Sequence, residues 1–285
     1  MTSLSDLGVS SVKNTRKNWL IHVILMSGVI VILFPFLWTI IASFKITKEF
    51  FRFPPTFWPD QWTLFQYKAA WNFAPIGRFL VNSAVQSACI TFGQLLTASM
   101  AAYAFAKLEF RGREVLFYIV LATMMIPIHV TMIPLFVTMS KLGWDNTYQG
   151  LIIPFLANAF SIFLLRQFFM TVPQDLEDAA IIDGCSKARF LFRILIPVSR
   201  TGLAAAGIFT FVHHWNTYMW PLLITSSNRM RTVQIGLAMF VEREAGTDFG
   251  RLMAASVIVA LPTIIAFLMG QKEFIEGITM TGIKG

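Results

Sequence analysis

The chain has 285 residues, of which 56% are hydrophobic and only 13% are charged, and its mean hydropathy is +0.64. Soluble proteins carry about 25% charged residues, so this composition excludes an ordinary soluble domain. Apolar runs of about 20 residues, the length that crosses about 30 Å of hydrocarbon, recur along the chain and predict a polytopic membrane protein. Many of the bases behind the net charge of +8 flank these runs, which favours lipid headgroups over nucleic acid as their partner.

We expect an all-α membrane protein with six spans in a single domain. Their approximate bounds are 19–44, 80–105, 116–138, 150–170, 202–225 and 252–270. The first run is too long for the apolar region of a signal peptide and has no small-residue cleavage site, so it should stay as a span. The segment 45–79 is rich in Pro, Trp and Tyr and is predicted to lie at the membrane–water interface.

The distribution of basic residues favours an inside N-terminus. If the N-terminus lies inside, thirteen of the 23 Lys and Arg residues fall in inner segments and the other ten in outer ones. This small excess of Lys and Arg on the inner side agrees with the positive-inside rule. The loop "AKLEFRGREV" at 106–115 and the basic N-terminal tail contribute most of it. With six spans, both termini are then expected in the cytoplasm.

Polar residues and prolines cluster in three of the predicted spans. The second span contains Asn82, Ser83, Gln86, Ser87, Thr91 and Gln94, the third contains "MMIPIHVTMIP" around His129, and the fifth contains "HHWNTYMWP". Polar groups at membrane depth are costly unless they face a partner helix or a wet cavity. Hydrogen bonding between helices and lining of a pathway both remain open. The candidates for the lining are Asn82, Gln86, Trp215 and Asn216.

Motifs for catalysis are absent from the sequence. It contains no G-x-x-x-x-G-K-[ST] phosphate loop and no H-E-x-x-H, G-x-S-x-G or C-x-x-C pattern. The adjacent His213 and His214 would point about 100° apart on a helix, so a structural or gating role is favoured over a metal site. Cys89 and Cys185 are not expected to pair. We expect no enzyme active site, metal or cofactor in this chain, so energy for any driven work would come from a partner.

The charged stretch "TVPQDLEDAAIIDGCSKARFLFRILIPVSR", at 171–200, separates the fourth and fifth spans. Pro173 suits a first helical turn, and acidic residues complement the positive end of that helix: Asp175, Glu177 and Asp178. Gly184 is predicted to end the helix in the left-handed region, Ser186 to cap a second helix, and Pro197 to bend the chain.

Two roles for this helical hairpin fit its residues. It could lie in the headgroups as an amphipathic anchor, or it could dock onto another protein. The small side chains of Ala179 and Ala180 would allow another protein to approach closely, and Arg189 and Arg193 lie one turn apart on one face of the second helix.

Within the hairpin, "DAAIIDGCSKARFLFRILIP" resembles the EAA loop of permease subunits in ATP-binding-cassette importers, whose pattern is E-A-A-x3-G-x9-I-x-L-P. The matching residues are Asp178, Ala179, Ala180, Gly184, Ile194, Ile196 and Pro197, with Asp178 in place of Glu and Ile196 in place of Leu. In that family the loop forms a coupling helix that sits in a cleft of the cytoplasmic ATPase. The resemblance therefore implies that the hairpin docks onto an ATPase and that the N-terminus lies inside the cell. The resemblance implies coupling roles for Glu177, Asp178, Ala179, Ala180, Asp183, Gly184, Arg189 and Pro197.

Other segments are similar to the carbohydrate uptake branch of these importers, in its second, maltose-type permease subunit. They are "ILFPFLWTIIASFK", "PPTFWPDQWTLFQY", "KLGWDNTYQGLIIP", "WNTYMWPLL" and "GITMTGIKG", while "RQFFMTVP" is also similar to glycerol-3-phosphate permeases. The resemblance implies a type I importer permease fold in the bacterial inner membrane. The solute is expected to be a sugar, an oligosaccharide, or a polyol or glycerol phosphate, and the sequence does not name it.

The same resemblance implies four kinds of partner. They are a second, homologous permease in a heterodimer, two ATPase subunits that bind ATP and Mg²⁺, an extracytoplasmic solute-binding protein and membrane lipid. The loop at about 226–251 should reach the binding protein, and the C-terminal tail should run toward the ATPases.

A self-sufficient secondary transporter is the alternative. Such proteins often have inverted repeats and ionisable groups within their spans. Apart from His129, His213 and His214 the predicted spans have few titratable groups, and no internal repeat is evident. These observations favour the importer.

Overall fold

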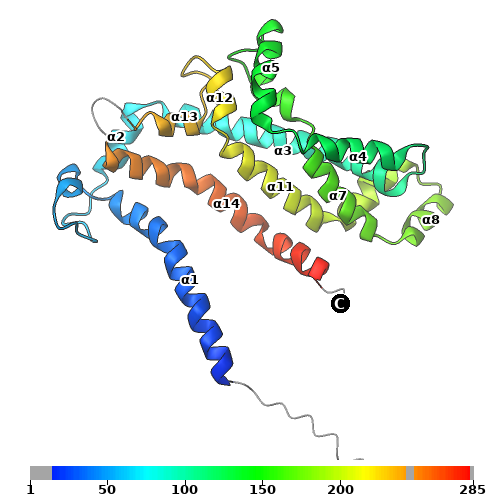
Figure 1. Cartoon of the computed structure of the whole chain (residues 1–285), viewed down its shortest axis with the longest axis horizontal. Helices are drawn as coiled ribbons and strands as arrows, with labels where there is room; N and C mark the ends of the chain where they lie inside the picture. The colour runs from blue at the N-terminus through cyan, green and yellow to red at the C-terminus, as the bar shows by residue number, and fades with distance from the viewer. Residues whose placement is uncertain (1–14, 242–246, 283–285) are drawn as a thin grey trace, which may run out of the picture.

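The computed structural model describes residues 15–241 and 247–282, and all regular structure in these residues is helical. The α-helices, drawn in Figure 1, are α1 (Thr15–Ala42), α2 (Phe65–Phe73), α3 (Ile76–Lys107), α4 (Arg113–Thr123), α5 (Ile128–Lys141), α6 (Tyr148–Ile152), α7 (Ala159–Thr171), α8 (Gln174–Ile182), α9 (Lys187–Phe190), α10 (Ile196–Val198), α11 (Arg200–Trp215), α12 (Met219–Ile224), α13 (Val233–Ala238) and α14 (Phe249–Gly282). Two 3₁₀ helices, η1 (Thr47–Phe51) and η2 (Ile153–Phe155), and a π-helix, η3 (Leu191–Leu195), complete the order.

Three helices in the described part of the chain are long and apolar enough to cross a membrane unaided. They contain the segments Ile21–Ala42, Ile76–Lys107 and Phe249–Lys272. Three bent pairs also qualify, each taken as one span: Arg113–Thr123 with Ile128–Lys141, Tyr148–Phe155 with Ala159–Thr171, and Lys187–Val198 with Arg200–Trp215. The chain therefore has up to six spans, and the predicted all-α membrane fold is confirmed.

The bent pairs differ from the continuous helices that the sequence predicts. The predicted span 116–138 turns by 91° between Thr123 and Ile128, because Pro127 has no N–H for the helix ladder and disfavours α-helical geometry in the residue before it. The predicted span 150–170 bends by 44° before α7, where the Asn158 side chain accepts a hydrogen bond from the Ser161 N–H and starts a new helix.

The predicted span 202–225 is also interrupted. Helix α11 ends at Trp215, and the short helix α12 begins only at Met219. The Asn216 amide donates to the Val212 carbonyl, and the Thr217 hydroxyl donates to the His213 carbonyl. These bonds satisfy carbonyl groups at the end of α11, where no further helical turn follows.

Helix α3 is the central element of the packed bundle. It contacts α7 and α11 along much of its length (Figure 1). Its buried residues recur every three or four positions, the spacing of one helical face, and include Phe79, Ser83, Gln86, Ile90 and Gln94. The polar groups predicted for the second span therefore point into the bundle.

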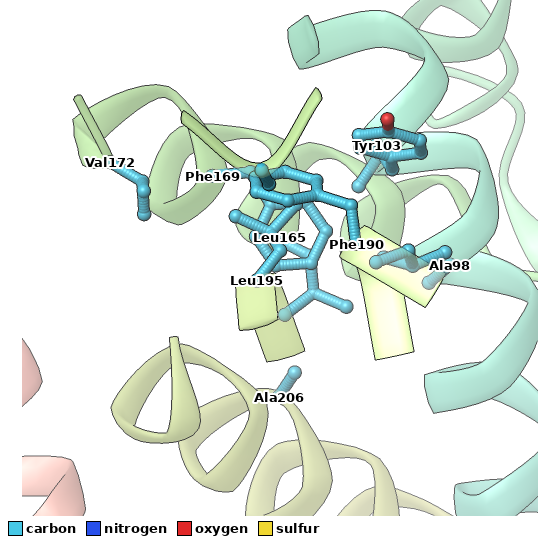
Figure 2. Packing of buried hydrophobic residues seen from close by; sticks show 11 residues of the cluster. Ala98, Tyr103, Leu165, Phe169, Val172, Phe190, Leu195 and Ala206 are labelled. Atoms are coloured by element: carbon cyan, nitrogen blue, oxygen red, sulfur yellow. The ribbon is translucent and has the colours of Figure 1, made fainter. Parts of the chain in front are cut away.

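Near the C-terminal end of α3, a hydrophobic cluster joins α3 to α7 and the hairpin. Tyr103 and Ala98 from α3 lie against Leu165 and Phe169 of α7 (Figure 2). The hairpin and the helices after it contribute Ala180, Phe190, Leu191, Leu195 and Ala206. The hairpin is thus part of the core of this chain.

Helix α1 is the exception to this packing. It runs away from the other helices (Figure 1), and none of its most apolar window is buried in this chain. Its exposed apolar side chains include Ile24, Ile30, Val31 and Ile32. Such a surface must be covered by lipid or by another protein.

Candidate coupling hairpin and polar cluster

The hairpin at 171–200 has the local geometry that the sequence predicts. Helix α8 begins directly after Pro173, carries Asp175 and Glu177 in its first turn, and is followed by Gly184 with a φ of +74°. The Ser186 Oγ accepts a hydrogen bond from the Arg189 N–H, so Ser186 caps α9 as expected. After Pro197 the chain turns by 82° between the segments Lys187–Val198 and Arg200–Trp215.

Most of the predicted coupling residues lie on the outer side of the hairpin. Those exposed in this chain are Asp178, Ala179, Asp183, Gly184, Arg189 and Pro197. Two large apolar side chains that the sequence analysis did not single out accompany them, Ile181 and Ile182, and Ile182 is 86% exposed. An apolar tip framed by charged residues is typical of a surface that another protein covers.

The other two predicted coupling residues, Glu177 and Ala180, face this chain. Ala180 lies in the hydrophobic cluster, and Glu177 is only 5% exposed. The Tyr103 hydroxyl donates to Glu177 Oε1 over 3.1 Å, and the Gln174 amide lies 3.4 Å from Oε2. Nearby, Lys107 Nζ donates to the Val172 carbonyl over 2.6 Å. Glu177 and Ala180 therefore attach the hairpin to the rest of this chain, and Glu177 does so through α3.

Of the predicted lining residues, Asn82 is committed to a bond network inside the chain. Its Nδ2 donates to the carbonyls of Arg229 (3.0 Å) and Arg231 (2.8 Å), and its Oδ1 accepts from the Tyr148 hydroxyl (2.7 Å). The neighbouring Ser83 Oγ accepts from the Val233 N–H. These contacts fasten the segment before α13 to the N-terminal part of α3.

The remaining lining candidates are dispersed. Trp215 is buried and donates from Nε1 to the Val259 carbonyl, while Asn216 is exposed and accepts from Gln234 Nε2. Gln86 is buried, and neither atom of its amide group has a partner in the described residues. No hydrogen bond within the described ranges joins the four candidates into one site.

The structure instead assembles a polar cluster around Gln94. Its Nε2 donates to the Phe155 carbonyl (2.8 Å) and lies 3.2 Å from His214 Nε2. Its Oε1 accepts from the hydroxyls of Ser161 (3.1 Å) and Thr210 (3.2 Å). The polarity of Gln94 and His214 was visible in the sequence, but no local pattern joins positions 120 residues apart.

The cluster lies at the break in the bent candidate span formed by Tyr148–Phe155 and Ala159–Thr171. Between η2 and α7 the backbone carbonyls of Phe155 and Leu156 lack helical partners, and the side chains of Gln94 and Thr97 donate to them. Interrupted helices are tolerated in a bilayer when neighbouring side chains satisfy the freed backbone in this way. Gln94 and Thr97 therefore make the break between η2 and α7 possible.

Next to the cluster is a pocket of about 290 Å³. Its lining residues are Gln94, Asn158, Phe160, Ser161, Phe209, Thr210, His213 and His214. Asn158 and His213 are exposed on the surface of this chain, which is a costly arrangement against lipid tails. The pocket therefore opens toward water or toward another protein chain.

No group of three or more His, Cys, Asp or Glu side chains that could hold a metal ion occurs in the described residues. The rings of His213 and His214 are 5.0 Å apart and nearly perpendicular. Cys89 and Cys185 are free thiols.

Comparison with known proteins assigns the family. The family model described as "Binding-protein-dependent transport system inner membrane component" matches residues 94–272, a range that includes the hairpin and the polar cluster. The chain belongs to this family. It is therefore the membrane-spanning permease subunit of a binding-protein-dependent importer.

Curated relatives and solved structures agree with this assignment. The permease is 34% identical to the sn-glycerol-3-phosphate transport system permease protein UgpE of Pectobacterium atrosepticum, over 90% of this chain and 94% of that one. It is 35% identical to UgpE of Yersinia enterocolitica over the same shares. It also superposes with a TM-score of 0.81 on a chain of a bacterial ABC transporter that imports the acidic polysaccharide alginate, with 23% identity and 92% and 98% of the two chains covered.

Proposed function

We propose that this permease forms half of a heterodimeric channel driven by two ATPase subunits. The observation that carries the proposal is the exposed tip of the hairpin, where Ile181 and Ile182 stand beside Asp178, Ala179 and Gly184. Apolar side chains of this size are suited to a protein cleft, and the charged residues around them can form the rim of an interface. ATP and Mg²⁺ bind to the ATPase partner in this scheme, and this chain supplies the docking surface.

The second, homologous permease covers α1 in the proposed assembly. Helix α1 contacts α14 only at its C-terminal end, and its most apolar window, none of which is buried in this chain, can gain contacts only from lipid or from another chain. Three polar residues are also exposed on this chain: Asn158, His213 and Asn216. Polar groups are costly against lipid tails, so the surface that carries them is proposed to face a partner chain or an aqueous path.

The extracytoplasmic solute-binding protein is proposed to contact the loop at 226–251, of which 242–246 lie outside the described residues. The Asn82 network fixes the first part of this loop on α3. This arrangement puts both chain termini in the cytoplasm, together with the hairpin. The C-terminal tail is proposed to run toward the ATPases, and its last residues, 283–285, lie outside the described part of the chain.

The solute class follows from the named relatives. Curated relatives are permeases for sn-glycerol 3-phosphate, and the superposed transporter imports alginate. Both solutes are hydroxylated, so we assign this permease to a sugar, an oligosaccharide, or a polyol or glycerol phosphate. No observation favours a self-sufficient secondary transporter.

The docking role can be tested with two neighbouring alanines. Ala179→Arg places a long charged side chain on the exposed face of α8. It should abolish ATP-driven uptake and co-purification of the ATPase with the permease, while insertion of the permease into the membrane is unchanged. Ala180→Arg is the matched comparison, because its side chain points into the core and should destabilise the chain itself. Normal uptake by Ala179→Arg in proteoliposomes would refute docking at this face.

A further inference from the structure

A groove of about 400 Å³ lies between the short helix α2 and the spanning helix α14. Its lining residues are Leu64, Tyr67, Lys68, Trp71, Asn72 and Ile258, of which only Ile258 belongs to α14. Helix α2 follows the span Ile21–Ala42 and precedes the span Ile76–Lys107, and it packs against α14 near the start of that helix (Figure 1). The groove therefore lies at the level where the long spans end, which is the membrane–water interface.

The α2 side of the groove carries a cation without a partner. Leu64, Lys68 and Asn72 recur every four positions, with Trp71 beside them, so their side chains share one face of α2. Lys68 is exposed and forms no ion pair within the described residues. No Asp or Glu is among the described residues that line the groove. The groove can therefore balance the charge of an anion.

The α14 side of the groove continues as an apolar stripe. Ile258, Leu261, Ile265 and Leu268 are three or four positions apart, so they share one face of the helix. The last three are 49%, 53% and 55% exposed in this chain. A helix rises about 15 Å between positions 258 and 268, which is about half the thickness of the hydrocarbon core. An acyl chain of one leaflet has the length and the chemistry to cover this stripe.

Tryptophan side chains mark the same level on the segment around α2. Trp58, Trp62 and Trp71 are 62%, 60% and 53% exposed. Indole rings combine an apolar body with an N–H donor, and they are enriched at the depth of the lipid headgroups. The surface around the groove is thus suited to contact with headgroups, and the stripe on α14 to contact with lipid tails.

We propose that this groove binds a phospholipid with an anionic headgroup. The headgroup pairs with the Lys68 ammonium, and one acyl chain passes Trp71 and Ile258 and follows the stripe on α14. A soluble protein fits this surface less well, because the stripe continues along a membrane-spanning helix into the hydrocarbon core. The inference goes beyond the proposed importer function and does not depend on it.

The test uses the permease purified in detergent with its co-eluting subunits, without nucleotide. Native mass spectrometry follows the binding of phosphatidylglycerol and, in parallel, of phosphatidylcholine with the same acyl chains, whose headgroup contains its own cation. The unsubstituted protein should bind phosphatidylglycerol more tightly. Lys68→Gln should weaken that binding about three- to tenfold and leave phosphatidylcholine binding nearly unchanged. Lys48→Gln, at an exposed lysine of η1 outside the groove, is the matched control and should have no effect.

A second variant tests the apolar part of the groove. Trp71→Ala removes apolar surface that both lipids use, so it should weaken the binding of both severalfold. Trp62→Ala removes a similarly exposed ring outside the groove and should have the smaller effect. Thermal unfolding midpoints close to that of the unsubstituted protein show that the variants are folded.

Three results would overturn the site. They are equal binding of the two lipids by the unsubstituted protein, the same phosphatidylglycerol affinity in Lys68→Gln and Lys48→Gln, and amine-reactive cross-links from Lys68 to another protein subunit in lipid nanodiscs. Such cross-links would assign the groove to a partner protein instead. ATP-driven uptake is measured separately, and its absence would contradict the importer function while leaving the lipid site standing.

Discussion

Tyr103, near the C-terminal end of α3, donates a hydrogen bond to the buried carboxylate of Glu177 in the hairpin, 3.1 Å away. The same helix carries Gln94 at its middle and Asn82 near its N-terminal end. Because α3 runs unbroken over 32 residues, it connects the hairpin, the pocket and the loop before α13 in one rigid element. Movement of the hairpin can therefore be transmitted to the pocket through α3, provided that the hairpin stays attached.

The first prediction concerns that attachment. Tyr103→Phe keeps the ring in the hydrophobic cluster but removes the hydroxyl, leaving the buried Glu177 without its donor from α3. Loss of a hydrogen bond to a charged group should lower the free energy of unfolding by about 1.5–3 kcal/mol. We expect ATP-driven uptake to fall severalfold while ATP hydrolysis by the assembled transporter continues. Tyr118→Phe, on the exposed face of α4, is the control and should leave both rates unchanged.

The second prediction concerns Gly184, which has a φ of +74° and no atom near the position of an added Cβ. Gly184→Leu therefore meets no steric clash, but its backbone conformation should cost about 1–2 kcal/mol. We expect the tip of the hairpin to shift and uptake to fall strongly, with normal membrane insertion. Gly184→Asn should retain more uptake, because Asn tolerates the left-handed region. Equal uptake by the Leu variant and the unsubstituted protein would contradict the role of this turn.

The hairpin shows why local structure was predictable from the sequence. The acidic first turn of α8, the glycine after it and the serine before α9 each act within a few residues of their own position, so their pattern specifies the backbone directly. The direction in which Glu177 faces was not predictable in this way. It depends on Tyr103, 74 positions away in the sequence, which becomes its neighbour only in the folded chain.

The third prediction concerns Asn82. Asn82→Ala removes three hydrogen bonds: the partly buried Arg231 carbonyl and Tyr148 hydroxyl lose their bonds to Asn82, and the Arg229 carbonyl keeps only the bond from Arg78 Nε. A hydrogen bond contributes about 0.5–1.5 kcal/mol, so the loss of three should lower the free energy of unfolding by about 1.5–4.5 kcal/mol. Amide hydrogen exchange should accelerate across 226–233. Asn72→Ala, at an exposed position of α2, is the control, and unchanged exchange in Asn82→Ala would contradict the fastening role.

The polar candidates for the lining illustrate a limit of sequence reasoning. Asn82 and Trp215 are polar or aromatic at membrane depth, as expected of a pathway, yet both are used in bonds within the chain. The sequence shows that polar groups within a span need hydrogen-bond partners, but only the folded structure shows which residues are those partners. The break before α7 creates the polar cluster by freeing the Phe155 carbonyl, and that break was not predicted.

The last prediction concerns Gly236 of α13, where an added Cβ would collide with the ring of Phe79. Phe79 is fully buried in a hydrophobic cluster with Trp215, Val233 and Ala255, so the ring has little room to move away. Gly236→Ala should therefore lower the free energy of unfolding by about 1–3 kcal/mol, as overpacking of a core does. Gly28→Ala, on α1 with no atom within 4 Å of the added Cβ, is the matched control and should be neutral or slightly stabilising. If the collision is the cause, Phe79→Leu should cost less in the Gly236→Ala background than alone, because the smaller side chain relieves the contact. Additive effects of the two substitutions in thermal unfolding would show that α13 does not press on α3 at this point.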